Sequence, residues 1–241
     1  KVFGERRKKF EPINVKFKNN NLDLNVSIVK FSKSDINKKI KLPKKVTVNL
    51  AEEIGMQFGD GFLSSKRSDY RLKGNPKNEK DYYASYVKPL YNKLFNVNLD
   101  LKESYKSYGF ELRSKAIWEF KTNVLGIKPG KKYKIDFPEK LKVNDVKILA
   151  GFIRGLFDTD GFLYFSKSGG KIGYPRIELK TSSPRLRKQL MEILEQKNFK
   201  PHTRSTQIGR TFEIYLSGPK VLEKWCVEIR FGNLKHMTKY L

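Results

Sequence analysis

Histidine and cysteine are nearly absent from this chain of 241 residues, which contains two His and one Cys. The lone Cys226 excludes an internal disulfide and a cysteine-based zinc site, and it is typical of a reducing compartment. Two histidines, His202 and His236, are too few for a histidine-rich metal site. They also argue against a Ser-His-Asp triad, which needs a histidine as its base. The common zinc sites and nucleophilic triads therefore lack their residues.

Acidic residues are also scarce, because 51 Lys and Arg stand against 25 Asp and Glu and give a formal charge of +26. This excess destabilises a compact state by self-repulsion and makes a polyanion the expected partner. A hydrophobic content of 38%, with 17 Phe and 12 Tyr, indicates that a packed fold carries the charge, which argues against a ribosomal-type protein. The length allows one large domain or two small ones.

Long apolar runs are missing as well. No stretch approaches the length of a membrane-spanning helix, and residues 1–20 are too charged for a secretory signal. We therefore expect no membrane partner and an intracellular protein that is not secreted. The composition leaves open whether its compartment is an organelle or an archaeal or bacterial cytoplasm.

A nine-residue pattern occurs twice, at 53–61 and 153–161. Each copy has a glycine five residues before an aspartate, a second glycine directly after it, and then Phe-Leu. An Asp-Gly pair after a helix is usually only a turn. Two copies in the same phase, each with small residues one, five and nine positions before the aspartate, indicate a duplicated fold instead.

Each copy predicts a helix with a row of small side chains along one face. Glycine inside a helix costs about 1 kcal/mol relative to alanine, so these rows need a compensating contact, and the natural partner of one row is the other. The rows are Ala51, Gly55 and Gly59 in the first copy and Gly151, Gly155 and Thr159 in the second.

If the rows meet, both helices end together and bring Asp60 and Asp160 side by side, with Gly61 and Gly161 expected as left-handed residues that close the helices. Carboxylates at helix C-termini face the negative end of the helix dipole, and two of them repel each other. A divalent cation would relieve both effects. Aspartate oxygens suit Mg²⁺ or Mn²⁺.

The second copy, residues 149–161, closely resembles the motif of the LAGLIDADG homing endonucleases in their single-chain, two-repeat form. The first copy departs from the motif at Glu53 and Gln57, where apolar residues are usual, and at Phe58, which replaces the first aspartate. It retains the helix glycine, the terminal acid and the closing glycine. The resemblance covers roughly residues 43–241.

The hydrophobic patterns predict a mixed α/β (α+β) fold of two pseudo-symmetric αββαββα repeats, whose strands form a β-saddle as a DNA-binding surface. In the first repeat we expect a strand at 62–63, a helix through 82–94, strands near 97–105 and 108–113 and a helix at 116–124. In the second repeat we expect strands at 162–166 and 174–181, a helix at 184–197, strands at 201–207 and 210–216 and a helix at 219–229.

The domains are predicted as an N-terminal extension at 1–42, a first repeat at 43–127, a linker at 128–137 and a second repeat at 138–241. Alternating residues predict two short strands in the extension, at 13–17 and 24–31. The extension is either a further DNA-contacting arm or a small hairpin that packs on the body.

Strand polarity supports DNA binding independently of the motifs. From 176 to 180 apolar and charged residues alternate, so one strand face packs on helices and the other meets something polar. Arg and Lys on such a face can read guanine edges and hold phosphates. The candidate DNA-contacting residues are Arg67, Arg71, Lys73, Arg113, Arg176, Glu178, Lys180, Arg204 and Arg210.

The resemblance implies hydrolysis of one phosphodiester per strand across the minor groove. Asp60 and Asp160 would bind the metal, each serving one strand, with the carbonyl groups of Gly59 and Thr159 as additional candidate ligands. The motif's Asp158 is expected to have a structural role at its helix end.

The family also places a basic residue near each site. The expected position in the first half makes Lys134 or Lys132 the candidate, and in the second half Lys239 is preferred over Lys235. Near the ends of equivalent strands, Lys180 and Asn75 are expected to border the sites.

Three functions follow from these observations. The first is a monomeric homing endonuclease for a long, specific double-stranded DNA site, which the resemblance links to mobility of an intron or intein. The second is a maturase that binds intron RNA, and the third is a DNA-binding regulator without cleavage. Retention of both acids argues against the third. Splicing by this chain as an intein is not expected, since it lacks an N-terminal Cys or Ser and a C-terminal His-Asn pair.

Overall fold

The first repeat is built on one helix, one antiparallel sheet and the helices behind it. The computed structural model describes residues 21–168, 171–205 and 211–238. The first repeat consists of α2 (Val48–Gly59), β1 (Gly61–Leu63), β2 (Asp69–Gly74), α3 (Lys80–Tyr82), a π-helical turn (Tyr83–Val87), α4 (Lys88–Phe95), β3 (Lys102–Ser104), β4 (Ser107–Arg113), α5 (Lys115–Glu119) and a second π-helical turn (Phe120–Val124). A short helix, α1 (Lys33–Asn37), precedes it.

The second repeat follows the same order after two 3₁₀ turns at Lys132–Lys134 and Glu139–Leu141. Its elements are α6 (Val146–Asp160), β5 (Gly161–Ser168), β6 (Lys171–Thr181), α7 (Pro184–Gln196), β7 (His202–Ser205), β8 (Phe212–Ser217), α8 (Pro219–Glu228) and α9 (Leu234–Met237). In the described residues each repeat has one antiparallel sheet, ordered β1-β2-β4-β3 and β5-β6-β8-β7. The predicted duplication of αββαββα is therefore confirmed.

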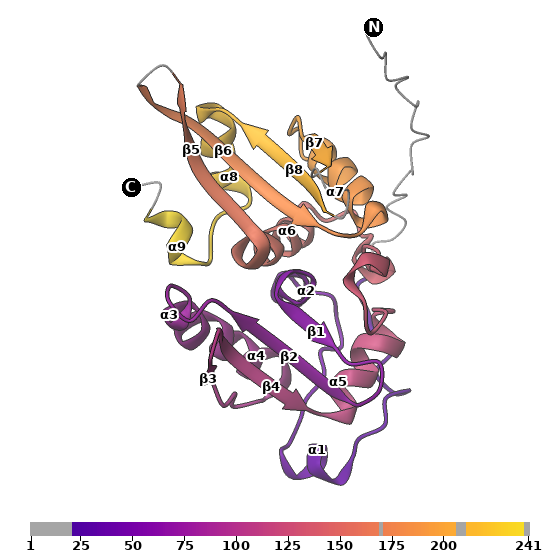
Figure 1. Cartoon of the computed structure of the whole chain (residues 1–241). Coiled ribbons are helices and arrows are strands. Elements are labelled where there is room, and N and C mark those ends of the chain that lie inside the picture. The colour runs from indigo at the N-terminus through magenta and orange to yellow at the C-terminus, as the bar shows by residue number, and fades with distance from the viewer. Residues whose placement is uncertain (1–20, 169–170, 206–210, 239–241) are drawn as a thin grey trace, which may run out of the picture.

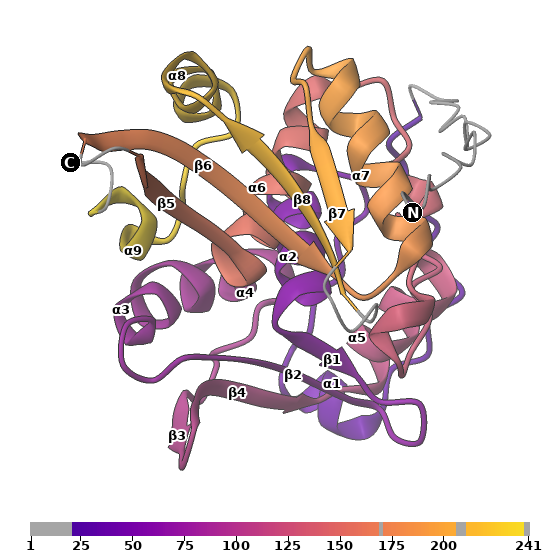
Figure 2. The ribbon, with the colours of Figure 1, turned by 45° about the horizontal axis from the view of Figure 1, so that its top comes forward.

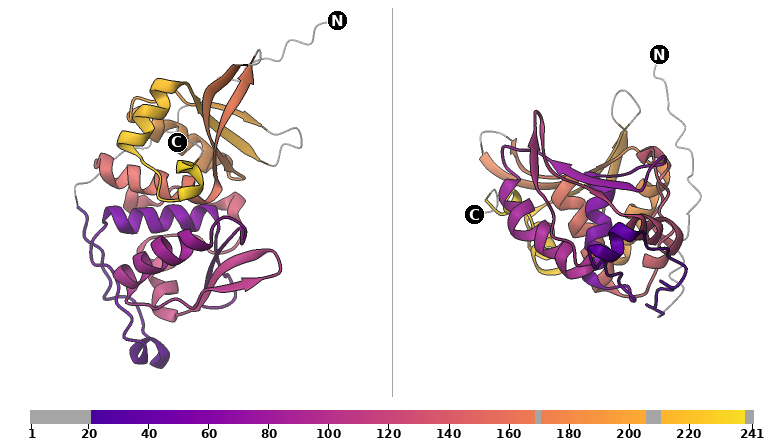
Figure 3. Two further views of the ribbon diagram at one scale, coloured as in Figure 1. Left: turned by 90° about the vertical axis from the view of Figure 1, so that its left-hand side faces the viewer. Right: turned by 90° about the horizontal axis from the view of Figure 1, so that it is seen from below.

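The helices α2 and α6 lie at the middle of the molecule, between the two sheets (Figure 1). Tilting the view shows the strands of both sheets on one side, with β5 and β6 above and β1 and β2 below (Figure 2). Side and bottom views show the other helices behind the sheets (Figure 3). Within the described residues no helix is long and apolar enough to span a membrane.

The rows of small residues form the contact between the two repeats, and α2 and α6 pack together more extensively than any other pair of elements. A Cβ added at Gly55 would overlap the carbonyl oxygen of Phe152, and one added at Gly155 would overlap that of Glu52. At Gly151 an added Cβ would lie 2.7 Å from the carbonyl oxygen of Val48. The predicted close approach of the two backbones is therefore confirmed.

The left-handed conformation predicted for Gly61 and Gly161 is wrong. Gly161 has φ −88° and ψ 161°, and Gly61 is not among the glycines with positive φ. Strands β1 and β5 begin directly at these glycines, so their backbone is already extended. Glycine is still required for space, because a Cβ at Gly61 would lie 2.5 Å from the Cα of Gln57 and one at Gly161 would overlap Phe157.

The strand predicted at 24–31 is also wrong, and the strand predicted at 13–17 lies outside the described residues. Only an isolated bridge forms nearby, between Asp23 and Lys45. The side chain of Asn25 accepts a hydrogen bond from the backbone N–H of Ser27 at 3.2 Å, and a turn follows. Asparagine turn chemistry therefore prevails over the alternating pattern.

Residues 21–42 pack on the first repeat through Asp35, which is fully buried. Its carboxylate accepts hydrogen bonds from the Ser114 hydroxyl at 2.6 Å and from the backbone N–H groups of Ala116 and Ser32 at 3.2 and 2.9 Å. Burial acts to raise the pKa of Asp35, but these hydrogen bonds outweigh it and lower the pKa below its ordinary value. Asp35 thus ties α1 to the start of α5.

We expect Gly155→Ala to destabilise the protein by about 2–4 kcal/mol, because the added methyl group meets rigid backbone of the facing helix. Gly151→Ala is the graded control, since its Cβ would meet Val48 at the more open start of α2, and it should cost less. Urea unfolding measures both values. A Gly155→Ala variant as stable as the wild type would show that the helix backbones are not in contact.

Asp35 should make stability depend on acid pH. A carboxyl group whose folded-state pKa is lowered stabilises the fold above its unfolded pKa of about 4, and this contribution is lost as pH falls through the folded value. Asp35→Asn should cost about 1–3 kcal/mol at pH 7 and show a smaller loss of stability below pH 4 than the wild type. Unfolding curves from pH 7 to pH 2.5 test this, and equal slopes in both proteins would contradict it.

Candidate active site between the two repeats

The C-terminal ends of α2 and α6 bring the two motif aspartates together. Asp60 caps α2 with helical backbone angles and donates its N–H to the carbonyl of Met56 at 3.1 Å, whereas α6 continues to Asp160. A Cβ at Gly59 would overlap the side chain of Thr159 and lie 3.3 Å from the backbone nitrogen of Asp160. The two carboxylates therefore leave the ends of helices that are in direct contact.

Both carboxyl groups are partly buried, and both have raised pKa values. Burial, then the charges of Asp160 and Glu79, raise the pKa of Asp60 to about 7. Burial likewise raises the pKa of Asp160. Lys132 and Lys235 act in the opposite direction on both groups. The site therefore holds two acids that resist ionisation and two lysines that favour it.

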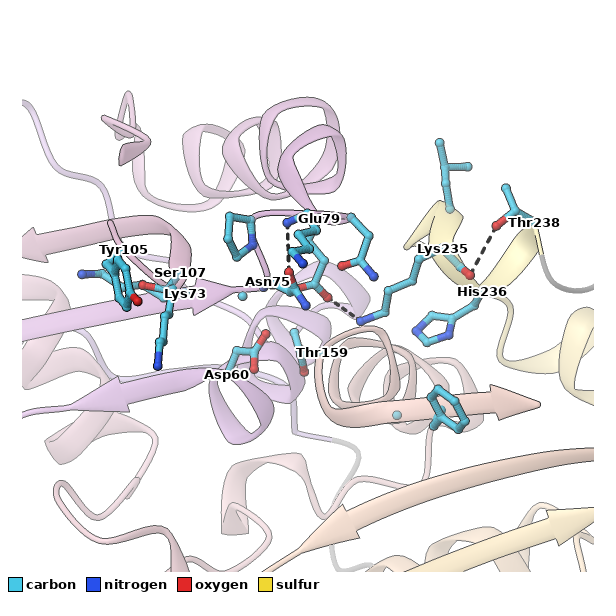
Figure 4. A pocket seen from close by; sticks show the side chains of 18 residues that line it. Asp60, Lys73, Asn75, Glu79, Tyr105, Ser107, Thr159, Lys235, His236 and Thr238 are labelled. Atoms are coloured by element: carbon cyan, nitrogen blue, oxygen red, sulfur yellow. Dashed lines mark hydrogen bonds and ion pairs between the residues drawn. The ribbon is translucent and has the colours of Figure 1, made fainter. Parts of the chain in front are cut away.

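Each aspartate lies in its own cavity. Asp60 lines the larger one, of about 1030 Å³, together with Lys73, Asn75, Glu79 and Lys235 (Figure 4). We call this the Asp60 pocket. In Figure 4 the side chains of Glu79 and Lys235 point toward each other beside Asp60 and Thr159.

The smaller cavity, of about 180 Å³, is the Asp160 pocket. It is lined by Asp160, Lys132, Lys180, Thr181 and Ser182, among others. Lys180 and Asn75 were expected to border the sites, and the structure places one in each pocket. The two pockets thus combine residues from both repeats and the linker.

The candidate basic residues fall at different places. Lys132 lines the Asp160 pocket, while Lys134 lies over the ring of Tyr133 at 5.7 Å and lines neither pocket. Lys239, the preferred choice in the second half, lies outside the described residues. Lys235, the less favoured choice, is in the Asp60 pocket. Position relative to the aspartates therefore favours Lys132 and Lys235.

The donor set suits a hard divalent cation. Two carboxylates converge here, and the described residues contain no group of three or more His, Cys, Asp and Glu side chains arranged to hold a metal. Mg²⁺ is commonly bound by one or two carboxylates, with water and substrate phosphate completing its shell. Thr159 lines the Asp60 pocket, and Gly59 packs against the side chain of Thr159. A role of the carbonyl groups of Gly59 and Thr159 as metal ligands stays a prediction.

The exposed face of the first sheet carries paired charges. Arg71 lies 4.5 Å from the ring centroid of Phe62, Lys73 pairs with Glu111 at 2.7 Å, and Arg113 pairs with Asp69 at 2.9 Å. Arg67 and Arg71 line the same cavity, of about 660 Å³. The four basic residues predicted for this half therefore lie on or beside one sheet.

The second sheet presents Arg176, Lys180 and Arg204 around Glu178. The Glu178 side chain is only 6% exposed, and its carboxylate lies 3.5–3.7 Å from all three cations. A carboxylate covered in this way orients the basic residues and is not itself open to DNA. The predicted contact at Arg210 lies outside the described residues.

Two of the three residues that depart from the motif in the first helix, Glu53 and Gln57, belong to a buried polar network. Lys121 is fully buried and donates to Glu53 at 2.5 Å and to Gln57 at 2.6 Å. Tyr91 also donates to Glu53, and the Lys121 ammonium lies 4.4 Å from the ring centroid of Tyr70. Glu53 and Gln57 are polar where the motif has apolar residues, and both pair with the buried Lys121 of the second π-helical turn.

Several site residues could not be found from the sequence. Glu79 pairs with Lys235, which is 156 positions away, and Glu52 pairs with Arg154 across the two motif helices.

Asp158 accepts a hydrogen bond from the backbone N–H of Gly232 at 2.8 Å. Burial is the main reason that the pKa of Asp158 is raised to about 8. Asp158 therefore anchors the C-terminal segment, consistent with the structural role expected for it.

Comparison with known proteins identifies a LAGLIDADG-like domain at residues 147–229. The fold is similar to that of the homing endonuclease I-DmoI in complex with DNA and Mn, with a TM-score of 0.55 and 18% identity over 77% of this chain and 98% of that one. It is also similar to the I-LtrWI LAGLIDADG homing endonuclease bound to target DNA, with a TM-score of 0.52 and 9% identity over 81% and 88% of the two chains.

Part of this chain is also similar to a much longer protein, the glutamine–fructose-6-phosphate aminotransferase of Methanocaldococcus jannaschii. The identity is 32% over 127 residues, which are 52% of this chain but only 11% of the aminotransferase. The chain thus spans about a tenth of the length of that relative. The family match confirms the sequence-based resemblance over residues 147–229, and the structural matches confirm the two-repeat fold.

The buried acid pair should destabilise the metal-free protein. A carboxyl group whose folded-state pKa is about 7 binds more protons folded than unfolded, so stability should fall as pH rises from about 4 to 7. In EDTA at pH 8, Asp60→Asn should therefore be more stable than the wild type by about 1–3 kcal/mol, with little difference at pH 4. Urea unfolding tests this, with Asp100→Asn at an exposed carboxylate as the control. A variant less stable than the wild type at pH 8 would contradict it.

Proposed function

We propose that this chain, a two-repeat LAGLIDADG protein, is a monomeric endonuclease that uses a divalent cation to cleave both strands of a long, specific double-stranded DNA site. The observation that carries this proposal is the meeting of Asp60 and Asp160 at the ends of contacting helices, between two sheets lined with arginine and lysine. A protein that only binds DNA gains nothing from two repelling carboxylates beside a polyanion. The two acids are therefore better explained by catalysis.

In this proposal Asp60 and Asp160 hold the cation, and each serves the cleavage of one strand. The bound ion, Mg²⁺ or Mn²⁺, would supply an activated water and stabilise charge on the phosphate. I-DmoI structures with DNA and Mn, and with DNA and Ca, support a divalent cation for this fold. The raised pKa of Asp60 fits such a ligand, because a cation would offset the repulsion and the burial that keep it protonated.

Lys235 and Lys132 would act beside the aspartates. Each lies in a different pocket and lowers the pKa of both carboxyl groups, so each ammonium is within electrostatic reach of the reacting phosphate position. A lysine there would neutralise charge that develops on the phosphate oxygens. Lys73 and Lys180 line the same two pockets and would hold flanking phosphates.

The sheets would supply the DNA contacts. Arg71, Arg113, Arg176 and Arg204 lie on strands of the two sheets, where guanidinium groups can reach base edges in the major groove. Their acidic partners, such as Asp69 and Glu213, would fix the guanidinium orientation before DNA binds. Structures of I-DmoI and I-LtrWI with DNA support this use of the fold.

Cleavage should require a catalytic metal. Incubation with a randomised duplex library in Mg²⁺ should yield one family of cut sequences, while Ca²⁺ should support binding without cutting. Sequencing of the cut ends measures the result. Selective binding of structured RNA with no cleavage of any duplex would contradict the proposal and favour the maturase.

Asp160→Asn should retain DNA affinity within about threefold of the wild type but abolish double-strand cutting, because it removes one metal ligand and leaves the sheets intact. Gel shift in Ca²⁺ and cleavage of the recovered duplex in Mg²⁺ measure the two properties. Lys45→Gln, on an exposed ion pair with Asp23, is the control. Normal double-strand cutting by Asp160→Asn would show that the catalytic assignment is wrong.

A further inference from the structure

The Asp60 pocket contains a third carboxylate, Glu79, whose side chain is 4% exposed. One of its oxygens accepts a hydrogen bond from the ammonium of Lys235, and the other accepts from the backbone N–H of Asn75 at 2.5 Å. Gly74 leaves the space for this carboxylate, because a Cβ there would overlap it. Both oxygens thus accept hydrogen bonds from protein donors, and Glu79 holds the ammonium group of Lys235 in place.

Lys235 reaches the pocket from the other repeat, on a segment that is tied to α6 by two hydrogen bonds. The N–H of Gly232 donates to Asp158 at 2.8 Å, and the Asn233 amide donates to the Asp158 carbonyl at 3.0 Å. The Asn233 side chain also accepts from the N–H of Lys235 at 3.2 Å. The segment after α8 therefore positions the lysine's backbone, and Glu79 positions its ammonium group (Figure 4).

The Asp160 pocket, as far as the chain is described, lacks a second carboxylate of the kind that Glu79 supplies in the Asp60 pocket. Glu79 directly precedes α3, and the residue that directly precedes α7 in the second repeat is Ser183, whose hydroxyl donates to the carbonyl of Ile135 at 2.6 Å and accepts from the N–H of Leu186. Leu186 lines the Asp160 pocket and is 1% exposed. The described residues that line the Asp160 pocket include no acid other than Asp160, so Lys132 has there no counterpart of the buried Glu79 carboxylate.

We infer that Glu79 is a positioning residue that fixes Lys235 beside Asp60, so that cleavage of one DNA strand depends on Glu79 and cleavage of the other does not. This inference rests on the proposed function. A lysine side chain has four rotatable bonds, and a buried carboxylate that receives its ammonium removes much of that freedom before substrate binds. Without the acid, Lys235 would spend most of its time away from the phosphate, and a displacement of about 1 Å can cost about 100-fold in rate.

The test is Glu79→Gln, which keeps the shape of the side chain and removes its charge. Nicking of each strand is followed separately on a labelled duplex from the library, and Asp60→Asn and Asp160→Asn identify which strand each site serves. We expect the strand that depends on Asp60 to be cut about 10- to 100-fold more slowly and the other within about twofold, so that nicked DNA accumulates. DNA affinity in Ca²⁺ should stay within about threefold.

Glu139→Gln is the matched control, since it also removes an acid paired with a lysine, Lys142, at 2.6 Å, on a carboxylate that is 73% exposed and lies outside both pockets. Both strands should be cut within about twofold of the wild-type rate. Equal slowing of both strands by Glu79→Gln, no slowing of either, or a more than tenfold loss of DNA affinity would overturn the inference. A wild-type protein that cuts no duplex would overturn the proposed function, and this inference with it.

A second readout needs neither metal nor DNA. Glu79→Gln and Lys235→Gln should each lower the Tm of the metal-free protein by about 3–8 °C, because each leaves a largely buried charge without its partner. The double variant should lose no more than the worse single variant, since the pair is already broken. Additive losses would show that Glu79 does not hold Lys235 and would overturn the inference.

Discussion

Gly55 and Gly155 allow the backbones of α2 and α6 to touch, and the position of every other functional group depends on that contact. Because the helices meet along their length, they end at the same level, and the acids that follow them are forced together. Each sheet begins directly at the end of its helix, at Gly61 and Gly161. The helix contact therefore fixes both the spacing of the acids and the placement of the two sheets on either side.

The fold tolerates an unusual amount of buried charge around this contact. Glu52 and Arg154 pair across the helices, and Lys121 is fully buried against Glu53. Burial lowers the pKa of Lys121, which the neighbouring carboxylate only partly offsets. Buried pairs of this kind contribute little net stability, yet removing one partner is strongly destabilising. Glu52 and Arg154 belong to different repeats, so their pairing favours one register of α2 against α6, whereas Lys121 and Glu53 both lie in the first repeat.

The duplication, the order of elements and the helix contact were all accessible from sequence, because each follows from local periodicity or from a motif that occurs twice. The conformation of Gly61 was not, since the same Asp-Gly pair fits a left-handed turn or the first residue of a strand, and only the next element decides. The turn after Asn25 was not predicted, because the alternating apolar residues indicate a strand. In the structure the side-chain hydrogen bond of Asn25 forms the turn instead. The partnership of Glu79 and Lys235 leaves no local trace, because it joins the residue before α3 to a residue of α9 in the other repeat.

Each pocket contains a lysine from outside the repeat that supplies its aspartate. The linker carries Lys132 to the acid of the second repeat, and α9 of the second repeat carries Lys235 to the acid of the first. A single repeat separated from its partner would keep its carboxylate, its sheet and the lysine of that sheet, Lys73 or Lys180, but would lose the second lysine of its pocket, Lys235 or Lys132. Each pocket is therefore complete only when both repeats are joined in one chain, as it would be in a symmetric dimer whose two subunits had been fused.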